Sequence, residues 1–505
     1  MRINVGGFLG RRALLSPGKV GLVCEGREFT FLELNQRANR LAHAMEKLGV
    51  RPGDRVGLLS VNGVADYDLF FGLAKLGAIL VPINYRLAVP ELLSILEDSG
   101  VRVLVYDPEF ADMVSKVRDQ VGFRAIVLGR GPDENYHDLV SEAGDAEPII
   151  QSGDDDVVVI LYTVWATGRP KGVMLTHLNF LWTSVTTMAT LTRLGPTYLL
   201  ALPLFHIGGL AWLPVLMHLG IRCALMPRFD PDRFLDLIPA AAVTAFGAVP
   251  TMLYFLKDSP NFDSRKFSGL SSILAYGSAV PVSLIRDYAQ HGIEIQQLYG
   301  LTECTGGAMV IDAEHALAKA GSCGLPFFHT LVKLVDELGQ EVPRGETGEV
   351  IIRGAQIMKG YWNQPEATEN ALRGGWLYTG DLARQDENGY YYIVDRKKDL
   401  IISGGENIFP GEIERVIHNH PGVSDVAVLA SPDPVWGELV MAAVVKKTGA
   451  VLTEKEIMAW CEGEIAGYKV PRQVIFIESL PRTLTGKMEK RKLRKMLQLL
   501  QAEKK

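Results

Sequence analysis

Features that direct a protein to an oxidising compartment or to a charged partner are scarce in this sequence. Only five of its 505 residues are cysteines, they are widely scattered, and no two stand in a C-x-x-C pair. This pattern predicts neither a disulfide framework nor a zinc site, and it favours reduced thiols in a cytoplasmic protein. Fifty-two basic and 58 acidic residues leave a formal net charge of −6, which gives no global reason to expect binding to nucleic acid or to an anionic membrane.

A signal peptide and a membrane span are also not predicted. The N-terminal apolar stretch is interrupted by Arg11 and Arg12 and lacks an A-x-A-like cleavage site. One run of twenty residues without a charge, 237–256, is long enough to span a bilayer. Because this run contains two prolines and a glycine, it instead predicts the end of a helix, a buried strand and a turn.

The sequence is rich in apolar residues, which make up 48% of its 505 residues. These are more than the core of one typical domain holds. Short β-branched runs alternate with amphipathic segments. Strands are predicted at Arg55–Leu59, 78–82, Val103–Tyr106, 124–128 and 156–162, and a helix at 66–76 that Gly77 ends. Alternation of this kind predicts a layered α/β fold with parallel sheets.

The pattern changes twice in the C-terminal third. Residues 324–392 alternate apolar and polar side chains with frequent glycine and proline, which predicts a small antiparallel barrel. A fresh α+β pattern follows, with helices predicted at 412–419 and 454–465 and strands at 426–429 and 440–446. The sequence therefore predicts a large multi-subdomain α/β domain at 1–395 and a small mobile lid domain at 396–505.

One loop is a candidate phosphate-binding site. The segment TVWATGRPKG, residues 163–172, follows a continuously apolar predicted strand and combines hydroxyls, glycines and Lys171. Backbone N–H groups of such a loop together with a lysine suit a phosphate. Taken alone, the segment is equally consistent with an ordinary strand-to-helix turn.

Five further segments stand in a fixed order after this loop: PLFH at 203–206, YGLTE at 299–303, YTGD at 378–381, DRKKD at 395–399 with SGGEN at 403–407, and PRTLTGK at 481–487. With these six segments the chain resembles, from end to end, the adenylate-forming superfamily of acyl-CoA synthetases, luciferases and nonribosomal-peptide adenylation domains. The resemblance implies two half-reactions. A carboxylate first attacks the α-phosphate of ATP to give acyl-AMP and pyrophosphate, and a thiol, usually CoA, then displaces AMP.

The resemblance also implies roles for individual residues. Glu303 would bind Mg²⁺ and Thr302 would donate to phosphate, while Lys487 would neutralise charge between the carboxylate and the α-phosphate. Arg396 would bind ribose or phosphate, and His206 would contact the carboxylate or clear its way. The ATP site would comprise Thr163, Thr167, Gly168, Lys171, Gly277, Ser278, Tyr299, Gly300, Thr302, Asp381, Ile393, Arg396 and Lys487.

The same resemblance places an acid pocket, a CoA channel and a hinge. The pocket walls would be His206, Ile207, Val249, Tyr276 and Met309, which are mostly apolar. Gly404, Gly405 and Trp436 would line the path of CoA, and Lys398 would be the pivot between two lid orientations. The pocket walls include no obvious basic residue for a second carboxylate, which favours a monocarboxylic fatty or aryl acid.

Several of these residues also have an ordinary structural interpretation. His206 alone is typical of a packed loop histidine, and Asp381 of a turn or cap residue. Trp436 is equally consistent with a lid-core aromatic. The tail from Lys487 carries eight basic residues against two glutamates, and with Leu493, Leu497 and Leu500 it predicts an amphipathic helix.

Three consecutive loop residues depart from the family. Val164, Trp165 and Ala166 stand where the family has Ser or Gly, then Gly, then Ser or Thr. Hydrogen bonds to charged groups contribute about 1.5–3 kcal/mol each, so two lost hydroxyls predict adenylation slowed by about 10²–10⁴-fold. The thioester step is predicted to be spared. Such a contiguous change indicates a specialised or engineered loop rather than general decay.

The sequence thus predicts an AMP-forming acyl-CoA ligase that uses ATP, Mg²⁺ and CoA on a small carboxylic acid. Two alternatives stay open: transfer of the acyl group to an amine or a carrier protein, and a protein that holds an acyl-adenylate or a nucleotide without turnover. No nucleic-acid partner and no membrane span are predicted, and the oligomeric state is left open.

Overall fold

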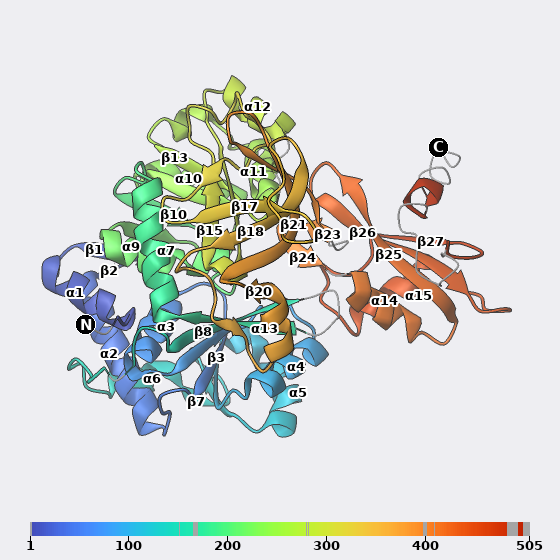
Figure 1. The fold of residues 1–505 in the computed structure, drawn as a ribbon. Helices are drawn as coiled ribbons and strands as arrows, with labels where there is room; N and C mark the ends of the chain where they lie inside the picture. Colours follow the sequence, from blue (N-terminus) through green and yellow to red (C-terminus); the bar gives the residue numbers. More distant parts are fainter. Residues whose placement is uncertain are drawn as a thin grey trace. The chain divides into compact units, whose positions relative to one another are not determined.

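The computed structural model describes residues 3–150, 152–164, 170–278, 280, 282–396, 401–408, 410–481 and 493–497. The chain divides into two compact units. The first comprises Met1–Tyr85, Ile95–Thr163 and Lys171–Asp395, and the second comprises Arg86–Ser94, Val164–Pro170 and Arg396–Lys505. Figure 1 shows that parallel sheets, helices and an antiparallel sheet make up the first unit.

An eight-stranded sheet in the first unit has the order β19-β9-β8-β4-β3-β5-β6-β7. Its strands are β3 (Arg55–Leu59), β4 (Ile79–Pro82), β5 (Val103–Tyr106), β6 (Arg124–Val127), β7 (Glu134–Asn135), β8 (Val157–Val164), β9 (Pro170–Thr176) and β19 (Gly360–Tyr361). The core pairs, β4 with β3, β3 with β5 and β5 with β6, are parallel. Helix α3 (Val64–Leu76) ends at Gly77, whose φ of 82° is the left-handed conformation that glycine adopts without strain. These elements confirm the parallel α/β prediction.

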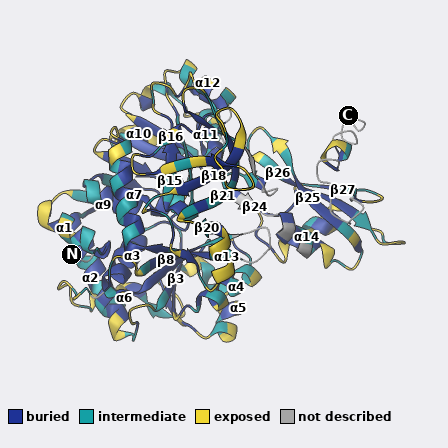
Figure 2. Ribbon diagram, in the orientation of Figure 1, coloured by how far each residue is buried: buried dark blue, intermediate teal, exposed yellow. Residues whose placement is uncertain are grey.

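A nine-stranded sheet in the first unit has the order β16-β15-β14-β13-β12-β10-β11-β1-β2. Its strands are β1 (Val20–Cys24), β2 (Arg27–Thr30), β10 (Thr197–Leu200), β11 (Arg222–Leu225), β12 (Ala245–Ala248), β13 (Ser272–Ala275), β14 (Gln296–Leu301), β15 (Gly306–Val310) and β16 (Leu325–Pro326). The inner pairs are parallel, and antiparallel pairs stand at both edges. The inner strands β10, β11, β12 and β13 are largely buried (Figure 2), as strands with both faces covered require.

The helices along these sheets are mostly short. They are α1 (Gly6–Leu15), α2 (Phe31–Lys47), α4 (Val89–Ser99), α5 (Ala111–Val121), α6 (Tyr136–Ser141), α7 (His177–Thr190), α8 (Ile207–Leu210), α9 (Trp212–Leu219), α10 (Pro231–Ala240), α11 (Pro250–Asp258), α12 (Val282–Gln290) and α13 (Pro365–Ala371). The uncharged run 237–256 becomes the end of α10, strand β12 and the start of α11. Across the residues that the structure describes, no helix is long and apolar enough to cross a membrane.

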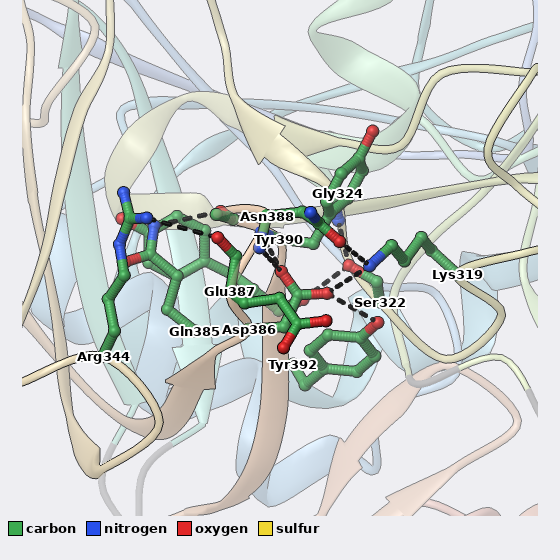
Figure 3. Close-up of polar contacts among 12 residues, drawn as sticks. Lys319, Ser322, Gly324, Arg344, Gln385, Asp386, Glu387, Asn388, Tyr390 and Tyr392 are labelled. Carbon is green, nitrogen blue, oxygen red and sulfur yellow. Dashed lines mark hydrogen bonds and ion pairs between the residues drawn. The ribbon is translucent and has the colours of Figure 1, made fainter.

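The predicted strand-and-turn region forms an antiparallel sheet of the first unit, β17-β18-β21-β20, with β22 paired to β21. Its strands are β17 (Leu331–Val335), β18 (Thr347–Arg353), β20 (Leu372–Arg373), β21 (Trp376–Gln385) and β22 (Tyr391–Arg396). The turn before β22 is tied down by Lys319, whose Nζ lies 2.7 Å from an Asp386 carboxylate oxygen and 2.6 Å from Asn388 Oδ1 (Figure 3). Ser322 Oγ donates to the carbonyl of Tyr391 at 2.8 Å. The strand that precedes the predicted hinge is therefore firmly anchored at its start.

The second unit contains a sheet of order β24-β23-β26-β25 with β27 paired to β26. Its elements are β23 (Ile401–Ser403), β24 (Glu406–Ile408), α14 (Pro410–His418), β25 (Val423–Asp433), β26 (Gly437–Lys446), α15 (Glu454–Glu462) and β27 (Gln473–Phe476). Isoleucines and valines of both helices and these strands form one buried cluster. Leu493 and Leu497 are buried in a second cluster, while Leu500 lies outside the described residues. The predicted α+β fold of the small C-terminal domain is confirmed.

All five cysteines are buried and free. Burial raises the thiol pKa to about 12 for Cys223, Cys304, Cys323 and Cys461. Thiols that stay protonated at neutral pH are poor nucleophiles. The cysteines therefore pack as small apolar side chains and are not candidate nucleophiles.

Candidate active site

Strand β14 and the short 3₁₀ helix that follows it, Thr302–Cys304, supply four predicted site residues: Tyr299, Gly300, Thr302 and Glu303. Gly300 is required at this place because a Cβ on it would lie 1.9 Å from the carbonyl oxygen of Gly306. This close approach of β14 to β15 allows the backbone to turn directly after Leu301. The turn places Thr302 and Glu303 at the end of a strand, where parallel sheets bind ligands.

Tyr299 and Asp381 come together although 82 residues separate them. The Tyr299 hydroxyl donates to Asp381 Oδ2 at 2.7 Å. Asp381 lies in β21 and is 2% exposed, and its backbone N–H donates to the Thr379 hydroxyl. A buried carboxylate beside an aromatic ring has the groups that a nucleoside needs, an acceptor for hydroxyls and an apolar face.

Glu303 is held by a second tyrosine that the motifs did not single out. The Tyr361 hydroxyl donates to Glu303 Oε1 at 2.9 Å, and the N–H of Met358 donates to the Glu303 carbonyl at 2.8 Å. Lys171 Nζ lies 4.7 Å from the centre of the Tyr361 ring, within the range of a cation–π contact. Burial, and then the neighbouring Glu303 carboxylate, raises the pKa of Tyr361 above its ordinary value, so the phenol remains a donor. Tyr361 thus connects the lysine of the phosphate loop with the acidic residue.

Tyr361→Phe is expected to alter how the protein responds to Mg²⁺. The Glu303 carboxylate then lacks a hydrogen bond that contributes about 1.5–3 kcal/mol, so the orientation of the carboxylate is less restricted. We expect the Mg²⁺ concentration for half-maximal ATP–pyrophosphate exchange to rise by roughly tenfold or more, which corresponds to about 1.4 kcal/mol. Tyr162→Phe is the matched control, because the Tyr162 hydroxyl likewise donates to a carboxylate, Asp98, at 2.6 Å. An equal shift in both variants would show that the effect is one of general stability.

The predicted phosphate loop stands between two strands, so its interpretation as a strand-to-helix turn is wrong. Strands β8 and β9 flank the loop and are neighbours in the sheet. Trp165, Ala166, Thr167 and Gly168 lie outside the described residues. At the edge of the loop, the Thr163 hydroxyl oxygen is buried and finds no hydrogen-bond partner among the described residues. A buried donor of this kind fits a phosphate oxygen.

The predicted acid-pocket residues, and Gly277 and Ser278 of the predicted ATP site, lie in or close to the strands of the nine-stranded sheet and at the start of α8. Gly277 follows β13 with a φ of 90°, and a Cβ on it would lie 3.1 Å from Val249, which follows β12. The Tyr276 hydroxyl donates to the carbonyl of Gly208 at 2.9 Å, next to Ile207 at the start of α8. His206 is the residue that precedes this helix. Ser278 follows Gly277, and Met309 is fully buried in β15 opposite Tyr299.

The second unit brings two of the predicted CoA residues together. Gly404 and Gly405 form the turn between β23 and β24 with φ values of 57° and 83°. The N–H of Gly404 donates to the carbonyl of Trp436 at 2.9 Å. Trp436 is 41% exposed, so its interpretation as a lid-core aromatic is wrong.

Some predicted residues cannot be placed in this geometry. Ile393 lies in β22, as does Arg396, whose side chain is not described, and Lys398 and Lys487 lie outside the described residues. No group of three or more His, Cys, Asp or Glu side chains that could hold a metal ion occurs in the described part of the chain. A single carboxylate such as Glu303 still fits Mg²⁺, which is commonly held by one or two carboxylates and the phosphates of a substrate.

Similarity to known proteins identifies the family of this chain. Residues 9–362 match the family model of the AMP-binding enzymes, and residues 412–487 match that of the AMP-binding enzyme C-terminal domain. The chain belongs to the AMP-binding enzyme family. It is a ligase of the acyl-CoA synthetase type within the adenylate-forming superfamily, whose acyl-CoA ligases use ATP, Mg²⁺ and CoA.

Relatives cover nearly the whole chain. A feruloyl-CoA synthase of Amycolatopsis sp is 41% identical over 495 residues, covering 97% of this chain and 99% of that protein. The long-chain-fatty-acid–CoA ligase FadD13 of Mycobacterium tuberculosis is also 41% identical over 495 residues, with 97% and 98% covered. The solved structure of the amide bond synthetase McbA from Marinactinospora thermotolerans superposes with a TM-score of 0.89 at 28% identity, covering 98% and 99% of the two chains.

Two further candidate site residues, Tyr361 and Trp212, lie outside the six motifs. Tyr361 follows Gly360 in the segment KGYW, and Trp212 stands six residues after His206. The signal was present as an aromatic residue close to a glycine or to a motif. It could not be interpreted without the partners, Glu303 and Tyr276, which lie 58 and 64 residues away.

Proposed function

We propose that this family member is an AMP-forming acyl-CoA ligase that activates a monocarboxylic fatty or aryl acid and passes the acyl group to CoA. The observation that carries the proposal is the convergence in one unit of the Tyr299–Asp381 pair, Glu303 and Lys171. These residues present a nucleoside acceptor, an oxygen ligand for a metal and a cation for phosphate. That combination serves attack of a carboxylate on ATP.

In the adenylation step, Asp381 accepts hydrogen bonds from the ribose hydroxyls and Tyr299 packs against adenine. Glu303 would hold Mg²⁺, and the bound ion would lower the repulsion between the carboxylate and the triphosphate. Thr163, Thr302 and Lys171 bind phosphate oxygens, and Lys487 acts at the α-phosphate. Charge stabilisation and positioning, rather than covalent chemistry by the protein, then account for the rate.

The thioester step uses the second unit. Gly404 and Gly405 leave a path without side chains, and the exposed indole of Trp436 packs against CoA. Lys398 is the pivot at which the small domain, residues 396–505, reorients between the half-reactions. Because acyl-AMP no longer carries the β- and γ-phosphates, the altered loop at Val164, Trp165 and Ala166 slows adenylation but spares this step.

The half-reactions can be tested separately. Synthetic acyl-AMP plus CoA is expected to give acyl-CoA at a rate well above that of the complete reaction from ATP and acid, because the impaired step is bypassed. Thioester is measured by chromatography, and folding of the sample by circular dichroism. A folded protein that forms no thioester from acyl-AMP and CoA would contradict the proposal.

Two other outcomes of the same assay have defined meanings. The structural similarity to McbA, an amide bond synthetase, makes an amine the alternative acceptor. Product with an amine but not with CoA would identify that activity. Tight binding of acyl-AMP without ATP–pyrophosphate exchange and without transfer to either acceptor would identify a protein that binds the adenylate without turnover.

A further inference from the structure

Three aromatic side chains, one of which is the predicted pocket residue Tyr276, form a connected wall. Tyr198 lies in β10, Trp212 begins α9 and Tyr276 follows β13. The rings of Tyr198 and Trp212 are stacked, with centroids 4.2 Å apart and planes inclined by 27°. We call these three residues the aromatic wall.

Hydrogen bonds fix the orientation of the wall. The indole N–H of Trp212 donates to the Tyr276 hydroxyl oxygen at 3.0 Å, and that hydroxyl donates to the carbonyl of Gly208 at 2.9 Å. Burial raises the pKa of Tyr276 to about 12, so the hydroxyl keeps the proton that it donates. A different orientation of Tyr276 would leave the indole N–H and the hydroxyl without these partners, which is costly for buried groups.

The space behind the wall is closed by backbone. A Cβ on Gly247, in β12, would lie 2.2 Å from the Tyr276 hydroxyl oxygen and 2.7 Å from that of Tyr198. On the other side, a Cβ on Gly208 would lie 3.0 Å from the Tyr276 ring. The Tyr276 ring is therefore held between two glycines, and an alkyl chain cannot pass between it and β12 without displacing it. Tyr198, Trp212 and Tyr276 are 0%, 7% and 8% exposed.

The wall stands directly beside the residues proposed to bind the acid. Tyr276 is itself one of the predicted pocket residues, and Gly208, whose carbonyl accepts its hydroxyl, is preceded by two more, Ile207 and His206. An acyl group that reaches Tyr276 from this side meets an aromatic side chain whose orientation is fixed by hydrogen bonds. Such a side chain favours an aryl ring, which packs against aromatic faces and edges, and obstructs a long flexible chain.

We propose that the aromatic wall closes the acid pocket on the side of β10 and β12 and selects compact aryl acids over long-chain fatty acids. This inference rests on the proposed function, because it presupposes that the site activates an acid. Trp212 is the specificity-determining residue of the wall, since its indole both fills the space and holds Tyr276.

The test compares acids within one assay. ATP–pyrophosphate exchange is measured with benzoate, cinnamate, hexanoate, dodecanoate and hexadecanoate. We expect kcat/KM for the better aryl acid to exceed that for hexadecanoate by at least about tenfold, the scale on which pocket shape discriminates substrates. A preference of the unaltered protein for dodecanoate or hexadecanoate would overturn the inference.

Trp212→Ala is expected to raise the ratio of kcat/KM for dodecanoate to that for cinnamate by about tenfold or more. Trp182→Ala is the matched control, because Trp182 packs on His329, with ring centroids 5.4 Å apart, and belongs to none of the ring contacts and hydrogen bonds that define the wall. Trp212→Leu provides the same comparison if the alanine variant does not fold. An unchanged ratio in a folded Trp212 variant would overturn the role of the wall.

Different experimental results would refute the role of the aromatic wall and the proposed function. If neither the unaltered protein nor a variant that combines Val164→Ser, Trp165→Gly and Ala166→Thr shows exchange with any of the acids, acid activation itself is refuted. Exchange that favours long chains would leave acid activation in place and refute only the aromatic wall.

Discussion

ATP–pyrophosphate exchange is expected to become about 10²–10⁴-fold faster when Val164→Ser, Trp165→Gly and Ala166→Thr are combined in one variant. The change restores two hydroxyl donors and the glycine of the family pattern. Each hydrogen bond to a charged phosphate contributes about 1.5–3 kcal/mol, and each 1.4 kcal/mol is tenfold in rate. The gain should appear in exchange and not in thioester formation from acyl-AMP, because the β- and γ-phosphates have left by then.

The control for this prediction is the serine substitution alone. Val164→Ser restores one donor, and we expect a smaller gain of about 10-fold or more. Rates are measured at saturating ATP and acid, so that changes in binding do not mask the change in turnover. Equal exchange rates in the unaltered protein and in the triple variant would show that the three residues do not limit adenylation.

Glu303→Gln is expected to reduce exchange by about 10²–10³-fold, the scale of removing one group that stabilises transition-state charge. The amide keeps the shape of the side chain and can still accept from Tyr361, but it removes the negative charge that attracts Mg²⁺. Transfer from synthetic acyl-AMP to CoA should be nearly unchanged. Binding of Mn²⁺ in the presence of ATP, followed by electron paramagnetic resonance, should weaken in parallel and gives a readout that does not depend on turnover.

Glu109→Gln is the matched control for this substitution. Glu109 forms an ion pair with Arg228, and both side chains are about half exposed. Exposed pairs contribute little to stability, so exchange and Mn²⁺ binding should stay unchanged in this variant. A Glu303→Gln variant that retains full exchange and the full affinity for Mn²⁺ would remove Glu303 from the proposed metal site.

Much of the fold followed from local patterns. The strands at Arg55–Leu59 and Val103–Tyr106 were predicted with their observed bounds, and the helix that Gly77 ends was predicted to within two residues of its start. Apolar runs and glycines that need a positive φ determine structure over a few residues. They can therefore be recognised in the sequence without knowledge of tertiary contacts. The strand-to-helix interpretation of the phosphate loop failed for the opposite reason, because pairing of β8 with β9 is a property of the sheet.

The candidate active site was likewise predictable from the sequence only in part. Tyr299, Asp381 and Glu303 were identified from short motifs, but their hydrogen-bond partners were not. Tyr361 has no motif of its own, and its role depends on a contact that β19 brings to β9 at the register Tyr361↔Val173. That register places the Tyr361 hydroxyl on Glu303 and its ring beside Lys171.

By itself, the sequence determined the family, the order of the elements and the kinds of side chain available for nucleotide, metal and acid. Short segments carry this information, because each motif places a particular type of residue at the end of one strand. Only the tertiary structure decided which side chains meet: Tyr361 with Glu303, and Trp212 with Tyr276 across 64 residues. Those contacts depend on how sheets and loops pack, and a close approach such as that of Gly247 to Tyr276 becomes visible only once β12 and β13 are paired.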